Sequence, residues 1–231
     1  MPLNFGDVNR SFGSAEGKED IGGCYFGQSS FAKLSIVQQC SVVNAKDLVK
    51  SKEELELFAP LGCGIQTGSG TLVNAAQAGP NDSVVITGMG GVGLSAVMGA
   101  AVQGCRTIIG IDIVDSRLKL AKEMGATHTI NGKDLPEGKE LADVVKELTE
   151  GLGPSISVDT TGVPALINGM ASWTRNRGKV IQVGTPPFDF KIEISAFEWM
   201  ASGKQFIGAI EGQAFPPVST THVIKFQISR D

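Results

Sequence analysis

Between residues 83 and 212, short apolar runs alternate with longer segments in which apolar residues recur at helical spacing. Strands joined by helices need crossover connections, and such connections give a parallel sheet that is covered on both faces. The sequence therefore predicts an α/β fold with a six-stranded parallel sheet. The predicted strands span residues 83–88, 106–112, 127–131, 155–162, 179–184 and 205–212. The predicted helices span residues 91–104, 116–125, 139–151 and 164–174.

The chain before the first predicted strand is less regular. Residues 1 to about 20 are polar and rich in glycine, and we expect a loop or a frayed end there. Residues 21–45 mix short apolar runs with serine and glutamine, as the strands of a small β unit do. Ser51 is positioned to cap a helix that Pro60 ends. Residues 213–231 fit none of these patterns.

The turn after the first predicted strand has the pattern Gly-x-Gly-x-x-Gly at Gly88, Gly90 and Gly93. Gly88 permits a tight turn, Gly90 has no Cβ to strike a diphosphate, and Gly93 lets the helix pack on the strand. Gly91 and Val92 lie between them, where free backbone N–H groups open the helix. The positive end of a helix binds anions, so this turn predicts a dinucleotide site. Six strands are also what a complete Rossmann sheet contains.

Asp112 ends the second predicted strand, nineteen positions after Gly93. An acidic side chain at this place accepts hydrogen bonds from the hydroxyls of the adenosine ribose, and it repels a 2′-phosphate. We therefore expect NAD rather than NADP. Arg117 follows one turn into the next helix, from where it could reach the ribose or a phosphate. A nucleotide-free α/β domain, a methyltransferase and a flavin-binding fold share parts of this pattern and stay open as alternatives.

Composition and charge exclude several classes of protein. The 231 residues are 42% hydrophobic and 19% charged, with a net charge of −4 and no long run of Lys or Arg, which argues against nucleic acid. The first residues lack the apolar core of a signal peptide, and no later stretch is long enough to span a bilayer, so we expect a cytoplasmic protein. The cysteines lie far apart, with no Cys-x-x-Cys pair, which argues against a disulfide scaffold or a zinc ribbon. They are Cys24, Cys40, Cys63 and Cys105.

Four segments, in their order along the chain, resemble the zinc-dependent medium-chain alcohol dehydrogenases, and most of all the aryl-alcohol (benzyl-alcohol) type. They are YFGQSSFAKLSIV, PLGCGIQTGSG, GMGGVGLSAVMGA and IIGIDIVDSRLKLAKEMGATHTIN. Such enzymes pair a GroES-like catalytic domain with a Rossmann domain and move hydride between an alcohol and NAD, while zinc polarises the alcohol oxygen. The resemblance implies a remnant of the GroES-like β domain over residues 1–58, an NAD-binding Rossmann domain over 59–212 and an atypical tail over 213–231.

The resemblance also implies roles for single residues. Thr67 matches the residue behind the nicotinamide ring. Tyr25 and Phe26 match positions that line the alcohol pocket, although both could equally be core aromatics. Backbone groups for the nicotinamide carboxamide are expected at Val183, Ala209 and Glu211. The strand at 205–212 corresponds to the edge through which dehydrogenases of this family form homodimers.

Cys63 matches the third protein ligand of the catalytic zinc, which in this family is held by two cysteines and one histidine. Judged from the residue alone, it could also be a nucleophile or a small buried filler. The family's first two ligands precede the segment that matches residue 21, so we expect this chain to lack them, together with the proton relay and the structural-zinc lobe. Cys24 and Cys40 are the only conceivable partners, and we expect neither to serve. One thiolate retains only a small part of the binding energy of a full zinc site.

Two functions of different class follow. The first is an oxidoreductase of this lineage, transferring hydride between an aryl alcohol and NAD, with this chain retaining mainly the NAD-binding half. The second is a catalytically silent module that binds NAD or self-associates. A zinc-free quinone reductase fits poorly, because that group does not keep a cysteine at the position of Cys63. We expect His128 and His222 to be structural or solvated.

Overall fold

The computed structural model describes residues 11–13, 20–22, 44–45 and 47–213 of the chain. The chain divides into two compact units, residues 1–58 and residues 59–231. The segments that contain Tyr25, Phe26, Cys24 and Cys40, and the tail from residue 214 onward, lie outside the described residues, so the predictions made for them stay predictions.

The first unit contributes two short strands and one helix to the described residues. Strand β1 (Ser11–Gly13) pairs antiparallel with β2 (Asp20–Gly22), with Phe12 opposite Ile21. The expectation of a loop before residue 20 is therefore wrong for β1, whose three residues are too few to show a periodic pattern. Helix α1 (Lys52–Phe58) begins after Ser51, whose Oγ accepts a hydrogen bond from the backbone N–H of Glu54 at 3.2 Å. This is the N-cap that the sequence predicts.

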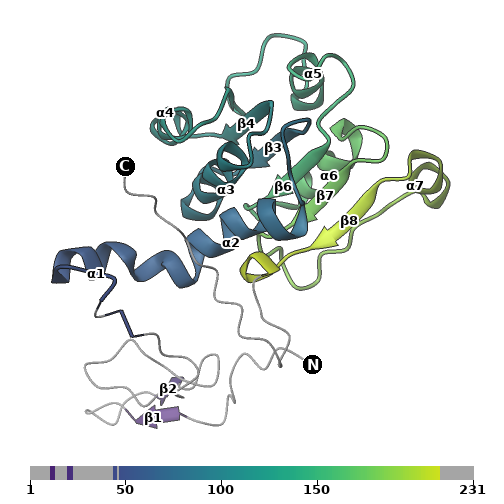
Figure 1. Cartoon of the computed structure of the whole chain (residues 1–231). Coiled ribbons are helices and arrows are strands. Elements are labelled where there is room, and N and C mark those ends of the chain that lie inside the picture. The colour runs from purple at the N-terminus through teal and green to yellow at the C-terminus, as the bar shows by residue number, and fades with distance from the viewer. Residues whose placement is uncertain (1–10, 14–19, 23–43, 46, 214–231) are drawn as a thin grey trace. The chain divides into compact units, whose positions relative to one another are not determined.

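The second unit is built on the six-stranded, all-parallel sheet that the sequence predicts (Figure 1). The strand order is β5-β4-β3-β6-β7-β8, so the chain builds outward from β3 on one side and then crosses to β6 on the other. Neighbouring strands pair in parallel, with Val85 opposite Ile109 and Ile86 opposite Val158. The strands are β3 (Ser83–Thr87), β4 (Thr107–Asp112), β5 (His128–Asn131), β6 (Ile156–Asp159), β7 (Lys179–Gln182) and β8 (Gln205–Gly208).

Helices cover both faces of this sheet (Figure 1). Along β3, Val84 and Ile86 pack into a core with Ala96 of α3, while Val85 between them packs into a second core with Met170 of α6. Each of these five side chains is fully buried. The helices are α2 (Gly64–Gly70), α3 (Gly91–Val102), α4 (Asp115–Glu123), α5 (Leu141–Glu147), α6 (Pro164–Trp173) and α7 (Ala196–Ser202). Helical turns also occur at η3 (Ala59–Gly62), η4 (Thr71–Ala75, of π type) and η5 (Glu211–Gln213).

Helix α7 is the element that the hydrophobic pattern does not predict. None of its residues is buried, and Phe197 and Met200 are 74% and 71% exposed, so it has no apolar stripe toward the core. Residues typical of helix ends bound it instead. The Ser195 side chain accepts a hydrogen bond from the backbone N–H of Glu198, and Gly203 ends the helix with a φ of 62°.

Four strands end earlier than predicted: β3 and β7 by one and two residues, and β6 and β8 by three and four. The backbone turns after the last two. Strand β6 stops at Asp159, three residues before Gly162 with its φ of 72°, and β8 stops at Gly208, before Glu211 with its φ of 49°. No helix among the described residues is long and apolar enough to cross a membrane.

The packing on β3 predicts that two truncations of apolar side chains lower the free energy of unfolding by very different amounts. Ile86→Ala should lower the free energy of unfolding by about 2–5 kcal/mol, because it leaves a cavity between the sheet and α3. Val102→Ala, at the 83% exposed end of α3, should change it by less than about 0.5 kcal/mol. Urea unfolding followed by circular dichroism measures both, and equal losses in the two variants would contradict this description of the core.

Candidate functional site

The order in which the chain adds strands reverses between β3 and β6, and a pocket opens beside this point. The connections after β3 and β6 run to opposite sides of the sheet, which leaves a crevice at the carboxyl ends of the strands. A pocket of about 670 Å³ lies there, within the range of small-ligand and cofactor sites. The predicted cofactor-binding residues that line it are Gly88, Gly90, Gly91, Val92, Gly93, Asp112 and Arg117.

The glycine turn brings the start of α3 against the end of β3. Gly88 has a φ of 88°, which a residue with a side chain adopts only at a cost. A Cβ on Gly93 would overlap the carbonyl oxygen of Gly88, so only glycine lets the helix approach this closely. A Cβ on Gly90 or Gly91 would meet no protein atom within 4 Å. These two residues therefore face open space, and the first turn of α3 has room for a bound group.

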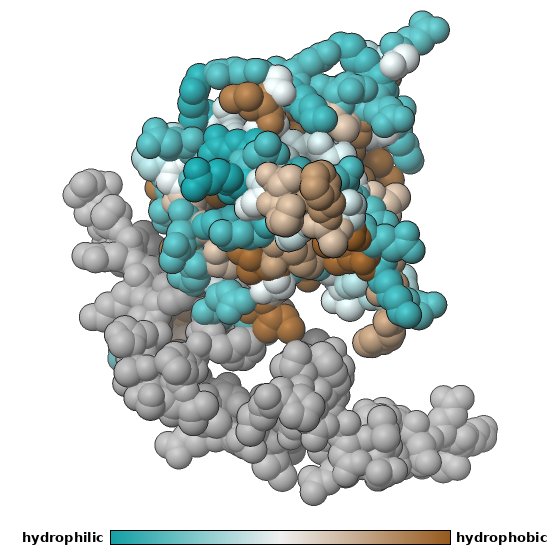
Figure 2. Space-filling model, turned by 90° about the vertical axis from the view of Figure 1, so that its right-hand side faces the viewer, coloured by the Kyte–Doolittle hydropathy of each residue, from teal (hydrophilic) through white to brown (hydrophobic). Residues whose placement is uncertain are grey.

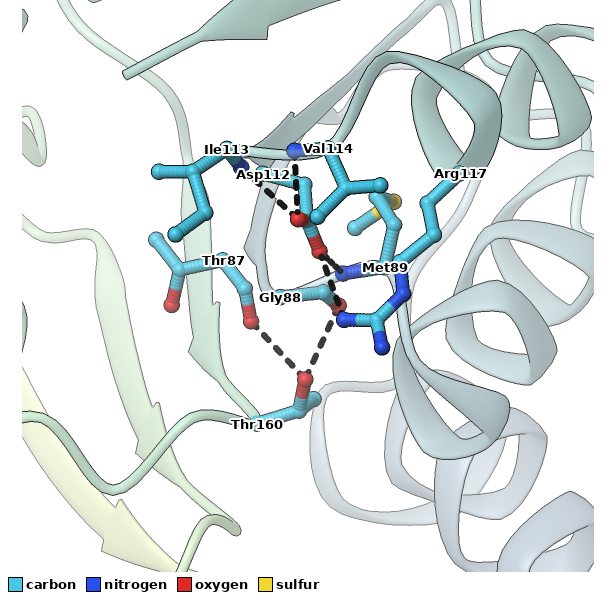
Figure 3. Close-up of polar contacts among 8 residues, drawn as sticks. All are labelled: Thr87, Gly88, Met89, Asp112, Ile113, Val114, Arg117 and Thr160. Atoms are coloured by element: carbon cyan, nitrogen blue, oxygen red, sulfur yellow. Dashed lines mark hydrogen bonds and ion pairs between the residues drawn. The ribbon is translucent and has the colours of Figure 1, made fainter. Parts of the chain in front are cut away.

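The turn and the end of β4 are joined by the carboxylate of Asp112, which is 8% exposed (Figure 3). One oxygen accepts hydrogen bonds from the backbone N–H groups of Ile113 (2.7 Å) and Val114 (3.0 Å). The other oxygen accepts one from the N–H of Met89 at 2.7 Å and lies 3.8 Å from Nη1 of Arg117. A carboxylate has about four acceptor positions, so it can receive a ligand hydroxyl beside these N–H groups once Arg117 moves. The Arg117 side chain is 55% exposed, which leaves it free to do so.

Sequence reasoning missed the second role of Asp112, which is to hold the glycine turn in place through Met89. It also missed Thr160, directly after β6. The Oγ1 of Thr160 lies 2.8 Å from the carbonyl oxygen of Thr87 and 3.0 Å from that of Gly88, and it donates to this pair (Figure 3). The sequence counts Thr160 as part of a strand, and only the pairing of β3 with β6 brings it over the turn.

Apolar side chains form another part of the pocket lining that the sequence did not single out. Ile113 follows β4, Leu141 begins α5, and Val163 and Leu166 belong to the start of α6. Ile113 is 53% exposed, an unusual state for an isoleucine beside a buried strand. An exposed apolar surface of this kind suits the flat face of a ring.

The other predicted cofactor residues lie outside the lining of this pocket. Thr67 lies in α2. Val183 directly follows β7 and donates its N–H to the carbonyl oxygen of Asp159 at 3.0 Å, while Ala209 directly follows β8 and is 6% exposed. Glu211 begins the η5 turn, and its carbonyl accepts a hydrogen bond from Gln66 at 3.3 Å. Helix α2 packs against η5, so Thr67 and Glu211 belong to neighbouring elements.

Cys63, directly before α2, is exposed, and its Sγ lies 4.0 Å from Oε1 of Glu211. Partial desolvation of the otherwise exposed thiol, together with the negative charge of Glu211, raises its pKa above the usual range, which favours the neutral thiol at pH 7. Among the described residues, no group of three or more His, Cys, Asp or Glu side chains could hold a metal ion. A catalytic zinc site needs three protein ligands. The donor set around Cys63 in this part of the chain therefore does not fit zinc.

The remaining cysteine and histidine that the structure describes lie away from the pocket. Cys105 is buried in the core on the α3 side of the sheet, as a small apolar residue would be. His128 begins β5, and its Nδ1 lies 2.9 Å from Oγ1 of Thr127. His222 lies outside the described residues.

Comparison with known proteins gives this arrangement a family. The sequence model of the zinc-binding dehydrogenases matches residues 91–226. The chain is 36% identical over 219 residues to geraniol dehydrogenase of Castellaniella defragrans, covering 94% of this chain and 57% of that protein. It is 33% identical over 227 residues to a probable alcohol dehydrogenase of a Pseudomonas species, covering 95% of this chain and 70% of that protein.

Solved structures agree with these sequence matches. The crystal structure of benzyl alcohol dehydrogenase from Acinetobacter calcoaceticus superposes with a TM-score of 0.74 at 36% identity, covering 89% of this chain and 55% of that one. The chain thus spans little more than half the length of the geraniol and benzyl alcohol dehydrogenases. Because the family's sequence model matches more than half of the chain, and the Pseudomonas relative is matched over 70% of its length at 33% identity, this chain belongs to the zinc-binding dehydrogenase family.

Proposed function

We propose that the second unit binds NAD in the pocket at the carboxyl ends of β3, β4 and β6. The observation that carries this proposal is the buried carboxylate of Asp112, held beside a glycine turn whose Gly90 and Gly91 face open space. The diphosphate would lie at the start of α3, where the backbone N–H groups of the first turn have no partner within the helix. The hydroxyls of the adenosine ribose would bind Asp112, with Arg117 turning from the carboxylate toward the ligand.

The apolar lining supports a position for the adenine ring. Ile113, Leu141 and Leu166 reach the same pocket from β4, α5 and α6. A ring between such side chains would cover the exposed surface of Ile113. The nicotinamide half would extend toward the carboxyl ends of β7 and β8, where Val183, Ala209 and Glu211 match positions that offer backbone groups to the carboxamide in this family, with Thr67 of α2 behind the ring.

We infer that the lineage's reaction is hydride transfer between an aryl alcohol and NAD. NAD, when bound, supplies the hydride acceptor, and the residues of this chain bind and orient it. Tyr25 and Phe26 would line the alcohol pocket. The donor set around Cys63 among the described residues is one thiol with one carboxylate nearby, so activation of the alcohol requires ligands from elsewhere.

The second candidate function is a module that binds NAD without turnover. The incomplete donor set around Cys63 in the described part of the chain favours it. Self-association would suit either candidate. Strand β8 is the outer strand of the described sheet, Phe206 on it is 36% exposed, and the neighbouring α7 exposes Phe197 and Met200. Figure 2 views the molecule from the side on which Figure 1 shows α7 and β8, and apolar surface gathers there among polar residues. We propose a homodimer through this edge.

Replacing the ribose carboxylate tests cofactor binding. Asp112→Asn should weaken NADH about tenfold, because a charged acceptor is lost. It should also narrow the preference for NADH over NADPH, because a neutral amide does not repel the 2′-phosphate. Titration followed by nicotinamide fluorescence measures both affinities. Glu123→Gln, which removes one charge from the exposed end of α4, serves as the control and should bind as the unmodified protein does. Unchanged NADH affinity in Asp112→Asn would remove this residue from the ribose site.

Assays with benzyl alcohol separate the two candidate functions. We expect the chain to bind NADH and to show no alcohol oxidation that a chelator abolishes, because the described residues offer zinc too few ligands. The measurement is NADH formation at 340 nm with added zinc, with and without chelator. Chelator-sensitive oxidation in the unmodified protein, lost in Cys63→Ser, would instead establish the first candidate.

The oligomeric state tests the proposed edge interface. Phe206→Lys should shift the molar mass in solution from dimer toward monomer, because it places a charge on the apolar edge. Val102→Lys changes an 83% exposed residue at the end of α3 and should leave the mass unchanged. Light scattering coupled to gel filtration gives the mass, and a monomeric unmodified protein would rule out the homodimer.

A further inference from the structure

The carboxylate of Asp159, at the end of β6, is completely buried, yet the groups that donate hydrogen bonds to it are all uncharged. Burying a carboxylate is costly unless hydrogen bonds replace its water. Asp159 has five such bonds. One oxygen accepts from the hydroxyls of Thr87 (2.8 Å) and Thr161 (2.6 Å) and from the N–H of Thr161 (3.1 Å). The other accepts from the N–H of Gly162 and from Nε2 of Gln182, both at 2.8 Å.

These donors come from three separate parts of the fold. Thr87 ends β3 and directly precedes the glycine turn. Thr161 and Gly162 lie in the connection from β6 to α6, and Gln182 ends β7. The backbone carbonyl of Asp159 also accepts the N–H groups of Val183 and Gly184 at 3.0 Å. Asp159, at the end of β6, thus contacts the ends of both neighbouring strands, β3 and β7.

Thr160 extends this network to the glycine turn itself. Its Oγ1 lies within hydrogen-bonding distance of the carbonyl oxygens of Thr87 and Gly88 (Figure 3). Gly88 continues directly into the turn that we assign to the diphosphate, and Val183 belongs to the loop that we assign to the nicotinamide. Asp159 and Thr160 are adjacent in sequence, so the two loops are joined through one short segment.

Asp159 and Thr160 lie where the strand order changes between β3 and β6. The connections after β3 and β6 diverge at the change of strand order, and one backbone hydrogen bond, from the N–H of Thr160 to the carbonyl oxygen of Thr87 at 3.0 Å, joins them beyond the paired strands. The side-chain hydrogen bonds of Asp159 and Thr160 add to the few backbone bonds that fix the distance between these loops. Each half of an extended ligand is bound well only if that distance is set before the ligand arrives.

We propose that Asp159 and Thr160 are positioning residues, which hold the glycine turn and the Val183 loop in the fixed relation that a dinucleotide needs. The role in binding rests on the proposed function, but the hydrogen bonds that join the two loops are present in the chain without ligand. A positioning role differs from a purely structural one in its effect on affinity. Loss of a residue that only stabilised the fold would weaken the binding of all ligands of the pocket equally.

Two substitutions remove different hydrogen bonds between the loops. Asp159→Asn replaces one acceptor oxygen by a donor and leaves at least one of the N–H groups of Thr161, Gly162 and Gln182 without a partner. Thr160→Val keeps the shape and removes only the hydroxyl, and Thr160→Ser restores it. Ser157→Ala is the matched control. Ser157 lies two residues earlier on β6, is also fully buried, and bonds to Thr174 and Trp173 away from the pocket.

Hydrogen exchange of the ligand-free protein is the first measurement. Asp159→Asn should speed exchange in two peptides far apart in sequence, residues 87–93 and residues 182–185. Thr160→Val should do so in 87–93 alone, Thr160→Ser should return to the unmodified rate, and Ser157→Ala should leave both peptides unchanged. Folded Asp159→Asn and Thr160→Val variants with unchanged exchange in 87–93 would overturn the proposal, whether or not NAD binds.

Competition binding is the second measurement, with adenosine, ADP-ribose and NADH as probes of increasing length. In Thr160→Val and Asp159→Asn, adenosine should bind within about twofold of its original affinity, while NADH should bind about tenfold more weakly or worse, with ADP-ribose between them. An equal loss for all three ligands would show a structural role only and contradict the proposal. If the unmodified protein binds none of them, the proposed function fails, while the exchange experiment still decides the positioning role.

Discussion

The closeness with which α3 meets β3 is the constraint on which the pocket depends. Any side chain at Gly93 would overlap the carbonyl oxygen of Gly88, so the helix could not begin where it does. With both glycines present, the first turn of α3 lies at the carboxyl end of the central strand, beside the change in strand order. Its unpaired N–H groups then face the space beside Gly90 and Gly91, which no protein atom fills within 4 Å of an added Cβ.

Two buried carboxylates support this turn from opposite sides of β3. Asp112 on β4 accepts the N–H of Met89, and Asp159 on β6 accepts the hydroxyl of Thr87, both with uncharged donors at short range. Each burial is tolerated because several hydrogen bonds replace the lost water. These bonds add to the backbone hydrogen bonds that hold the glycine turn against β4 and β6. Asp112 also keeps capacity for a ligand, whereas the donors around Asp159 occupy it fully.

Cys63 illustrates how lineage and local chemistry differ. The family resemblance gives it the role of a zinc ligand, yet its described surroundings raise the pKa of the thiol and provide one further donor, Glu211. A neutral thiol binds zinc poorly until it loses its proton. The second unit therefore contains the pocket that we propose for a dinucleotide, while metal chemistry at Cys63 requires groups from outside the described residues.

The six parallel strands, the helices between them and the glycine turn with Asp112 could be predicted from the chain, because each depends on neighbouring residues through apolar spacing, turn chemistry or strand ends. The apolar spacing did not predict α7, whose exposed surface has no apolar stripe, nor the short pairing of β1 with β2. The network of Asp159 and Thr160 could not be predicted, because it depends on which strands pair. The bond from Thr87 to Asp159 joins residues 72 positions apart, and it exists because β6 pairs with β3 rather than with β5, the strand before it. Strand order follows from the packing of the whole sheet, which no local pattern specifies.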